Sequence, residues 1–189
     1  MVLQLDIKDL MGLNLDKLEK STRVLVLLER RNFMKIEGNK VIKVYPTDVK
    51  NGTVEFPNGI EEISEYAFAG LKELTRIIIP NSIYEVGEFA FWCCQNLTGC
   101  IFKNPDCKIG KFCFRGCTKL KTIVLPKKLT ELPDMIFTDC INLQSIKVPN
   151  TISCISYYDF DDCLDLNRIQ WRGHVYSYED LLEYGSFSK

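Results

Sequence analysis

The sequence is poor in the groups that most enzymes use for catalysis. It contains one histidine, His174, which follows a turn near the C-terminus. Because histidine is the usual base that activates serine or cysteine nucleophiles, such a site has a single candidate base. A glycine-rich phosphate loop and paired carboxylates at a spacing useful for catalysis are also absent from the sequence. We therefore predict a protein without catalytic residues, cofactor or small-molecule substrate.

Long hydrophobic runs are missing near the N-terminus. The longest there, Val24 to Leu28, is five residues long and lies between Arg23 and the charged residues 29–31. Such a run is too short and too charged for a signal peptide or a membrane span. With Met1 taken as a natural start, we expect a cytoplasmic protein that does not insert into a membrane. A trimmed, secreted chain would have the same sequence.

Paired cysteine motifs are missing as well, although the chain has nine cysteines. Zinc sites typically use short spacings such as CxxC, and none occurs, so we predict no metal site. Four cysteines recur every 23 residues, at positions 94, 117, 140 and 163. We expect them to form a buried ladder of small, reduced side chains, the usual role of free cysteine.

A 23-residue repeat organises the chain from Leu74 to Asp165 and begins again at Leu166. We number its positions from the leucine, so that Leu74 is position 1. Position 18 is occupied by Phe91, Phe114, Phe137 and Phe160. A fixed period of this length is typical of a solenoid, in which each unit buries its apolar face against its neighbours. Residues 51–73 are a degenerate first copy, and we assign the repeats to residues 51–171.

Each repeat is predicted to contain three elements. A short strand such as 75–79 alternates apolar and polar residues and ends at a proline. A second extended piece follows. A turn then leads into a short helix, whose inward residues in the first full repeat are Ala90, Phe91 and Cys94.

The N-terminal 50 residues are predicted to form a cap. An amphipathic helix near 14–30 is expected either to cover the open end of the solenoid or to bind a partner. A hairpin over residues 33–45, with its turn at Glu37 to Asn39, is expected to follow.

The C-terminal residues 172–189 are predicted to form a second cap. Ser177 and Asp180 match a capping box for a short helix that ends at Gly185. Just before this cap, Asp159 occupies position 17, where other repeats have a small or apolar residue. We expect a local distortion there rather than a buried carboxylate, which would need a partner.

The unit LxxIxIPxxIxxI, followed by an aromatic-small-Phe-xx-Cys segment, is clearest at residues 120–126 and 137–140. It resembles the BspA-like branch of the leucine-rich repeats over about residues 51–171. The resemblance implies an α/β leucine-rich-repeat solenoid, with a parallel β-sheet on its concave side and short helices on its convex side. Members of that branch are often surface or secreted proteins linked to adhesion.

Alternation along the strands predicts a binding surface. Positions 4 and 6 point inward, so positions 3 and 5 are expected to face solvent on the concave side. The expected partner-binding residues are Arg76, Ile78, Ile101, Thr122, Val124, Lys147, Arg168 and Gln170. Three of them form an apolar row with a polar rim, which is typical of a protein interface. We predict a protein-interaction module, such as an intracellular inhibitor or adaptor. A surface adhesin for host matrix or glycan and a structural scaffold are the alternatives.

Net charge does not identify a partner, because 24 Lys and Arg are matched by 25 Asp and Glu. Locally, eight basic residues lie between 103 and 128, with Asp106 as the one acid: Lys103, Lys108, Lys111, Arg115, Lys119, Lys121, Lys127 and Lys128. Such a segment suits a nucleic acid or another polyanion. The eight occupy different positions of the repeat, so we expect them to wrap around the coil in solvent. Polyanion binding is kept as an alternative.

Overall fold

The computed structural model describes residues 33–188. The helix predicted near 14–30 therefore lies outside the described residues. The described chain begins with an antiparallel hairpin of β1 (Lys35–Glu37) and β2 (Lys40–Lys43), which turns through Gly38 at a positive φ of 61°. This confirms the predicted hairpin.

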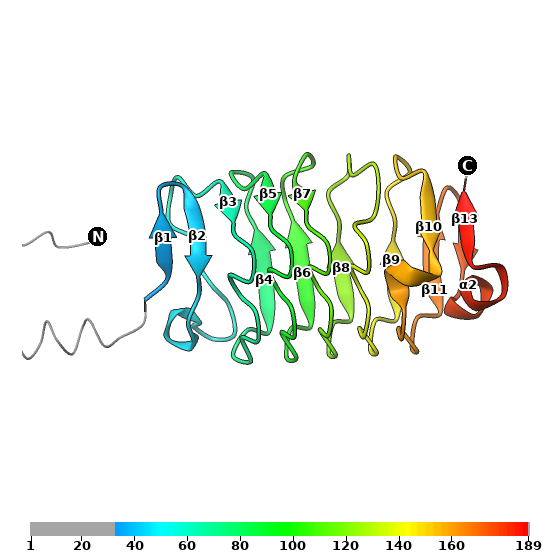
Figure 1. The fold of residues 1–189 in the computed structure, drawn as a ribbon, viewed down its shortest axis with the longest axis horizontal. Helices are drawn as coiled ribbons and strands as arrows, with labels where there is room; N and C mark the ends of the chain where they lie inside the picture. The colour runs from blue at the N-terminus through cyan, green and yellow to red at the C-terminus, as the bar shows by residue number, and fades with distance from the viewer. Residues whose placement is uncertain (1–32, 189) are drawn as a thin grey trace, which may run out of the picture. The chain divides into compact units, whose positions relative to one another are not determined.

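The repeats form a coil whose turns are stacked along the long axis of Figure 1. One strand of each turn belongs to a first row: β4 (Arg76–Ile79), β6 (Gly99–Phe102), β8 (Thr122–Val124), β9 (Ser145–Lys147) and β11 (Arg168–Trp171). Within this row β4, β6 and β8 form one parallel sheet, and β9 pairs in parallel with β11. Arg76 is opposite Gly99, and Gly99 is opposite Thr122, so the pairing register follows the 23-residue period. The predicted parallel solenoid is confirmed.

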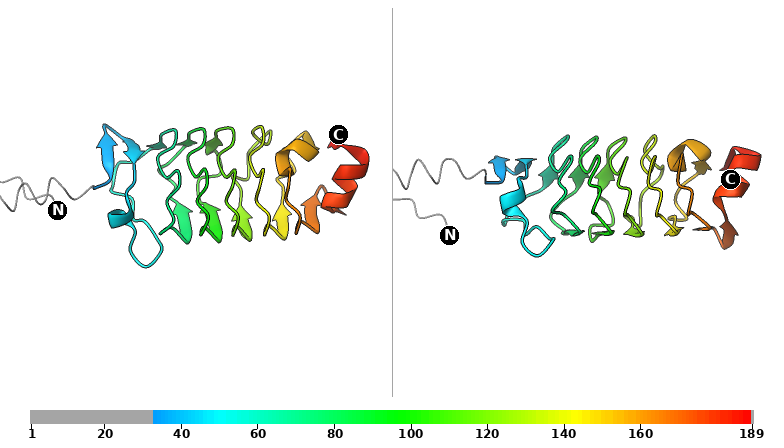
Figure 2. Two further views of the ribbon diagram at one scale, coloured as in Figure 1. Left: turned by 60° about the horizontal axis from the view of Figure 1, so that its bottom comes forward. Right: turned by 90° about the horizontal axis from the view of Figure 1, so that it is seen from below.

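A second row of shorter strands runs along another side of the stack, as Figure 2 shows. It contains β3 (Glu62–Ile63), β5 (Glu85–Val86) and β7 (Lys108–Ile109). These strands pair in parallel with one another and with β2, so the N-terminal hairpin extends this row.

The second row ends at β7 for a steric reason. The amide N–H of Gly110 donates to the Val86 carbonyl at 2.7 Å, and a Cβ on Gly110 would lie 2.4 Å from the backbone nitrogen of Glu88. The equivalent residue of the next turn is Pro133, which has a Cβ and no N–H. That turn can neither approach as closely nor continue the ladder. Further along the chain, β10 (Cys154–Ser156) forms a separate two-stranded sheet with β13 (Ser186–Ser188), and this pairing is antiparallel.

The convex-side helices predicted from the repeat are wrong. Their place is taken by consecutive tight turns, in which every second amide bonds within the turn, as from Trp92 to the Phe89 carbonyl at 2.9 Å. The amides between them bond to the next coil, as from Phe91 to the Cys113 carbonyl at 2.9 Å. An α-helix would direct each amide to the carbonyl four residues earlier, so this backbone cannot be helical.

Left-handed backbone at two repeat positions makes these turns. Position 16 has φ between 53° and 57° at Tyr66, Phe89, Phe112 and Met135. Position 20 also has positive φ, at Gly70, Cys93, Gly116, Asp139 and Asp162. The helix was predicted because the inward positions 17, 18 and 21 suit a helical spacing, but a pair of tight turns buries the same three side chains.

The core contains a stack of aromatic rings. Phe68, Phe91, Phe114, Phe137 and Phe160 are all fully buried, and consecutive ring centroids are separated by 4.8, 5.3, 6.0 and 5.6 Å. Each coil therefore packs its largest side chain on that of its neighbour. Removing one such ring would destabilise the fold by roughly 3–5 kcal/mol.

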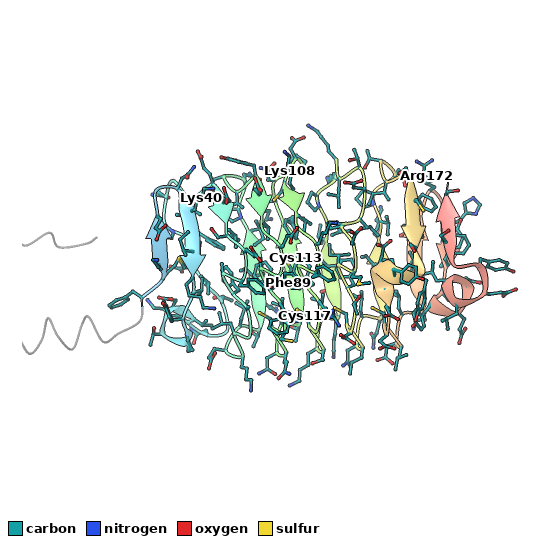
Figure 3. The ribbon with its side chains drawn as sticks, in the orientation of Figure 1. Lys40, Phe89, Lys108, Cys113, Cys117 and Arg172 are labelled. Atoms are coloured by element: carbon teal, nitrogen blue, oxygen red, sulfur yellow. The ribbon has the colours of Figure 1, made fainter. Side chains whose placement is uncertain are left out.

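The cysteine ladder beside the rings does more than fill space. Cys94, Cys117, Cys140 and Cys163 are buried as predicted, and each Sγ donates to a phenylalanine carbonyl of the preceding coil at 3.1–3.2 Å. Burial raises the pKa of the Cys94 thiol to about 12, which keeps it protonated and able to donate. Figure 3 shows Cys117 in the middle of the stack. All nine cysteines lie in the described range, and none is disulfide-bonded.

Asp159 is buried, contrary to the sequence prediction, with only 8% of its surface exposed. The predicted distortion is present too, as the 3-10 helix η3 (Tyr157–Phe160). The Asp159 carboxylate accepts from the Ser156 amide at 2.8 Å within a capping box, which supplies the partner. Loss of solvent raises the pKa of Asp159 to about 7, and the negative charge of Asp134 adds to the shift.

The C-terminal segment adds strands and one helix. β12 (His174–Tyr176) turns back antiparallel to β11, and α2 (Tyr178–Tyr184) follows. Ser177 and Asp180 form the predicted capping box, and Gly185 ends the helix at a φ of 74°. Leu181 is fully buried against the last repeat's core, so α2 packs onto the end of the coil. A second 3-10 helix, η2 (Pro46–Asp48), lies before the first repeat.

Candidate interaction surface

The exposed side of the first-row strands, which we call the strand face, carries the predicted site residues. Along β4 the exposed residues are Arg76 and Ile78, whereas Ile77 and Ile79 are buried. The same alternation holds in the other strands of the row, because successive side chains of a strand point to opposite faces. Seven of the eight predicted residues are exposed, and Gln170 is half-buried.

An apolar row crosses the middle of the strand face. The parallel register places Ile78 beside Ile101 and Ile101 beside Val124. Their exposed fractions are 54%, 38% and 50%. Adjacent strands are about 4.8 Å apart, so the three side chains form a continuous strip. Sequence reasoning predicted this strip, and the structure brings its members together.

The strip borders a shallow hollow of about 670 Å³. Gly99 lies in the hollow, between Arg76 and Thr122 in the register, and its missing side chain leaves the space open. The nearest atoms to a Cβ there would be the Thr122 hydroxyl, at 3.3 Å, and the Thr122 carbonyl oxygen, at 3.7 Å. The remaining lining residues include Thr53, Thr98 and Lys121.

Cations surround the apolar row. Arg76, Lys121, Lys147 and Arg168 are exposed, and within residues 33–188 none of them forms a salt bridge. Lys147 and Arg168 line a second, smaller hollow of about 260 Å³ over β9 and β11. The acidic residue in line with the apolar row is Glu55, at the N-terminal end.

The eight basic residues of segment 103–128 do not form one patch. Lys121 lies at the strand face, whereas Lys108 belongs to β7 of the second row and projects from the upper edge of the stack in Figure 3. Three of the eight are paired with acids: Lys111 with Asp134 at 2.7 Å, Arg115 with Asp139 at 3.4 Å, and Lys128 with Asp106 at 2.9 Å. Lys119 donates to Asn96 at 2.9 Å. Lys103 and Lys127 are exposed.

A second apolar ladder at the surface was missed in the sequence. The rings of Tyr66, Phe89 and Phe112 stack with centroids 4.9 and 4.7 Å apart and planes within 7° of parallel. All three are at position 16 and are exposed or half-buried. The recurrence of large apolar residues there was the available signal. Because the flat faces of these rings pack against one another, we interpret the ladder as stabilising the left-handed turns.

His174 is exposed in β12, with its ring 6.1 Å from that of Tyr176. Among residues 33–188 no group of three or more His, Cys, Asp or Glu side chains is placed to hold a metal ion. In the same range, no helix is long and apolar enough to cross a membrane.

Comparisons with known proteins place the repeat in a family. Six copies of the BspA type leucine rich repeat region match residues 45–179, which is more than half of the chain. Among solved structures, a leucine rich cell surface protein from Faecalibacterium prausnitzii is 29% identical, with a TM-score of 0.63, over 71% of this chain and 35% of its own. The leucine rich repeat protein of T. pallidum is 26% identical, with a TM-score of 0.60, over 69% of this chain and 62% of its own.

The chain thus spans less than two thirds of the length of either relative. Comparison with curated proteins gives no match. The family match agrees with the 23-residue period, the parallel register and the buried leucine, phenylalanine and cysteine ladders. The chain belongs to the BspA-type leucine-rich repeat family.

Proposed function

We propose that this chain is a non-catalytic binding module that engages a protein partner through its strand face. The observation that carries the proposal is the apolar row of Ile78, Ile101 and Val124, which is exposed beside a hollow. The inward-pointing residues of the same strands are already buried in the core, so the row is not needed for packing within the coil. An apolar centre with a polar rim is the usual arrangement of a protein interface. Family membership supports a binding role over a catalytic one.

We place this module at a cell surface, instead of in the cytoplasm as the sequence suggested. The support is the similarity to the cell surface protein of Faecalibacterium prausnitzii, at 29% identity. A surface adhesin was the alternative in the sequence, and it fits this relative better than an intracellular adaptor does. Within that setting we favour a protein over a glycan, because the row consists of aliphatic side chains.

The polyanion alternative has weaker support. Its eight basic residues lie on different sides of the coil, and three of them are engaged with acids. A phosphate backbone carries charges at regular spacing, so it is bound best by cations along one continuous track. The strand face supplies a more coherent surface.

Site-specific photo-crosslinking tests the proposed function. A photoreactive residue at Ile101 should yield a crosslink to one protein on host or microbial cells, whereas the same residue at the exposed Tyr84, outside the first-row strands, should not. Ile101→Glu combined with Val124→Glu should weaken that binding by at least about 2 kcal/mol, the scale of an interface hot spot. Equal crosslinking from both positions, or unchanged binding by the double variant, would move the site away from the strand face.

A further inference from the structure

We infer that the partner of the strand face is an acidic protein segment, in which carboxylates flank aliphatic side chains. This inference rests on the proposed function and narrows it. It follows from the charges around the apolar row, which have one sign over most of the strand face although the whole chain has a net charge of −1.

The cations lie close to the apolar row. Arg76 is two residues before Ile78 on the same strand, and Lys121 lines the same hollow just before β8. Lys147 continues the row beyond Val124, because both occupy position 5 of the repeat. With strands about 4.8 Å apart, these charges lie within about a Debye length of the apolar side chains, so a bound segment would feel them at physiological salt.

These cations are available to a partner. Elsewhere in the described chain, basic residues often have an acidic neighbour, as Lys40 has Glu62 at 2.6 Å and Lys111 has Asp134 at 2.7 Å. On the strand face, Arg76, Lys121, Lys147 and Arg168 form no ion pair with any residue in 33–188. An unpaired cation next to an apolar strip complements a carboxylate next to an aliphatic side chain.

The charge distribution also predicts a direction. Glu55 lies at the β4 end of the row, whereas Lys147 and Arg168 lie at the β11 end. The most acidic part of the partner should therefore lie over β9 and β11. The five strands of the row span about 20 Å, which an extended segment of about six residues covers.

A protein segment fits better than a nucleic acid. A phosphate backbone would use the four cations but leave Ile78, Ile101 and Val124 without a partner. A segment in which acidic residues flank an aliphatic stretch satisfies both, because its apolar side chains can fill the hollow at Gly99 while its carboxylates reach the rim.

Fluorescence anisotropy with defined peptides tests the inference. The probe is a labelled peptide of about twelve residues, in which glutamates flank a central stretch of leucine and valine. The matched control peptide has lysine in place of glutamate, and single-stranded DNA of similar charge is a second control. We expect the acidic peptide to bind, and we expect Arg76→Glu with Lys147→Glu to raise its Kd at least about 10-fold. Lys108→Glu, on the second row, should leave the Kd unchanged.

The outcomes distinguish the acidic preference of the strand face from its role as a protein-binding site. Loss of binding in Ile101→Glu, with no effect of the charge reversals, would keep the strand face as a protein site and overturn its acidic preference. Equal binding of the lysine peptide would do the same. Tighter binding of DNA than of the acidic peptide would replace the protein segment by a polyanion. Binding that neither Ile101→Glu nor the charge reversals alter would overturn the proposed function as well.

Discussion

The interior of the coil and the strand face arise from the same 23-residue repeat, but they differ in how much the residue type varies. Inside, position 18 is phenylalanine in five successive coils and position 21 is cysteine in four. On the strand face, position 3 changes in each coil: Thr53, Arg76, Gly99, Thr122, Ser145 and Arg168. An interior side chain contacts its equivalents above and below, so its size is constrained by both. The strand face meets solvent, which leaves it free to become specific.

The largest expected contrast is a buried charge against an exposed one. Cys117→Asp should lower the free energy of unfolding by about 4 kcal/mol or more, because it places an unpaired carboxylate in the ladder. Thr122→Asp adds the same charge on the strand face and should change stability by no more than about 0.5 kcal/mol. Urea denaturation of both variants measures the difference. Similar losses would mean that the ladder is accessible to water.

A glycine-to-alanine change should have a large effect on stability where two coils pack closely and a small effect on the strand face. Gly110→Ala brings a Cβ within 2.4 Å of the backbone nitrogen of Glu88, so it should destabilise the coil by about 3 kcal/mol. Gly99→Ala meets a side-chain hydroxyl at 3.3 Å, which can rotate, and should be tolerated within about 1 kcal/mol. Thermal melts of the two single variants provide the comparison. A stable Gly110→Ala protein would show that the second row does not depend on this close approach.

Asp159 is an interior position that should respond to pH. The pKa of Asp159 in the folded protein is about 7, above the ordinary 3.8. Between these two pH values the native state therefore holds a proton that the unfolded state has released. Stability therefore falls as pH rises from about 4 to 7, and the loss is complete above 7. Asp159→Asn should add roughly 2 kcal/mol of stability at pH 8 and almost none at pH 4. Denaturation at both pH values tests this, and an equal effect at both would assign the gain to something other than ionisation.

A small stability effect is expected for the apolar row of the strand face. Ile101→Glu and Val124→Glu, made together, replace exposed side chains and should lower the free energy of unfolding by less than about 1 kcal/mol. Circular dichroism melts would detect a larger loss. A strongly destabilised double variant would mean that these side chains are covered, and that the strand face is not a free surface.

Much of the fold was predictable because a fixed repeat length tells which residues of neighbouring coils lie side by side. The period of 23 placed Gly99 beside Arg76 and Thr122, and strand alternation separated Ile77 from Ile78. The candidate site followed from the same two rules. The capping box of Ser177 and Asp180 was also predictable, because its contacts are local.

Other features were not predicted, and most of them depend on distances between coils. The helix prediction failed since positions 17, 18 and 21 are buried equally well by tight turns that bond to the next coil. The burial of Asp159 was missed although its partner is local, because Ser156 and Asp159 form a capping box at the start of η3 like that of Ser177 and Asp180. The break after β7 needs the 2.4 Å approach at Gly110, which no sequence pattern states.

The sequence by itself determined the period, the inward and outward faces and the ladders, because these follow from spacing along one chain. Only the tertiary structure decided which cations stay unpaired. Lys111 and Lys147 are both exposed lysines in the sequence pattern, but a neighbouring coil presents Asp134 to Lys111, and no acid within residues 33–188 pairs with Lys147. Ion pairing depends on atoms of different coils coming within about 4 Å, a distance that stacking sets.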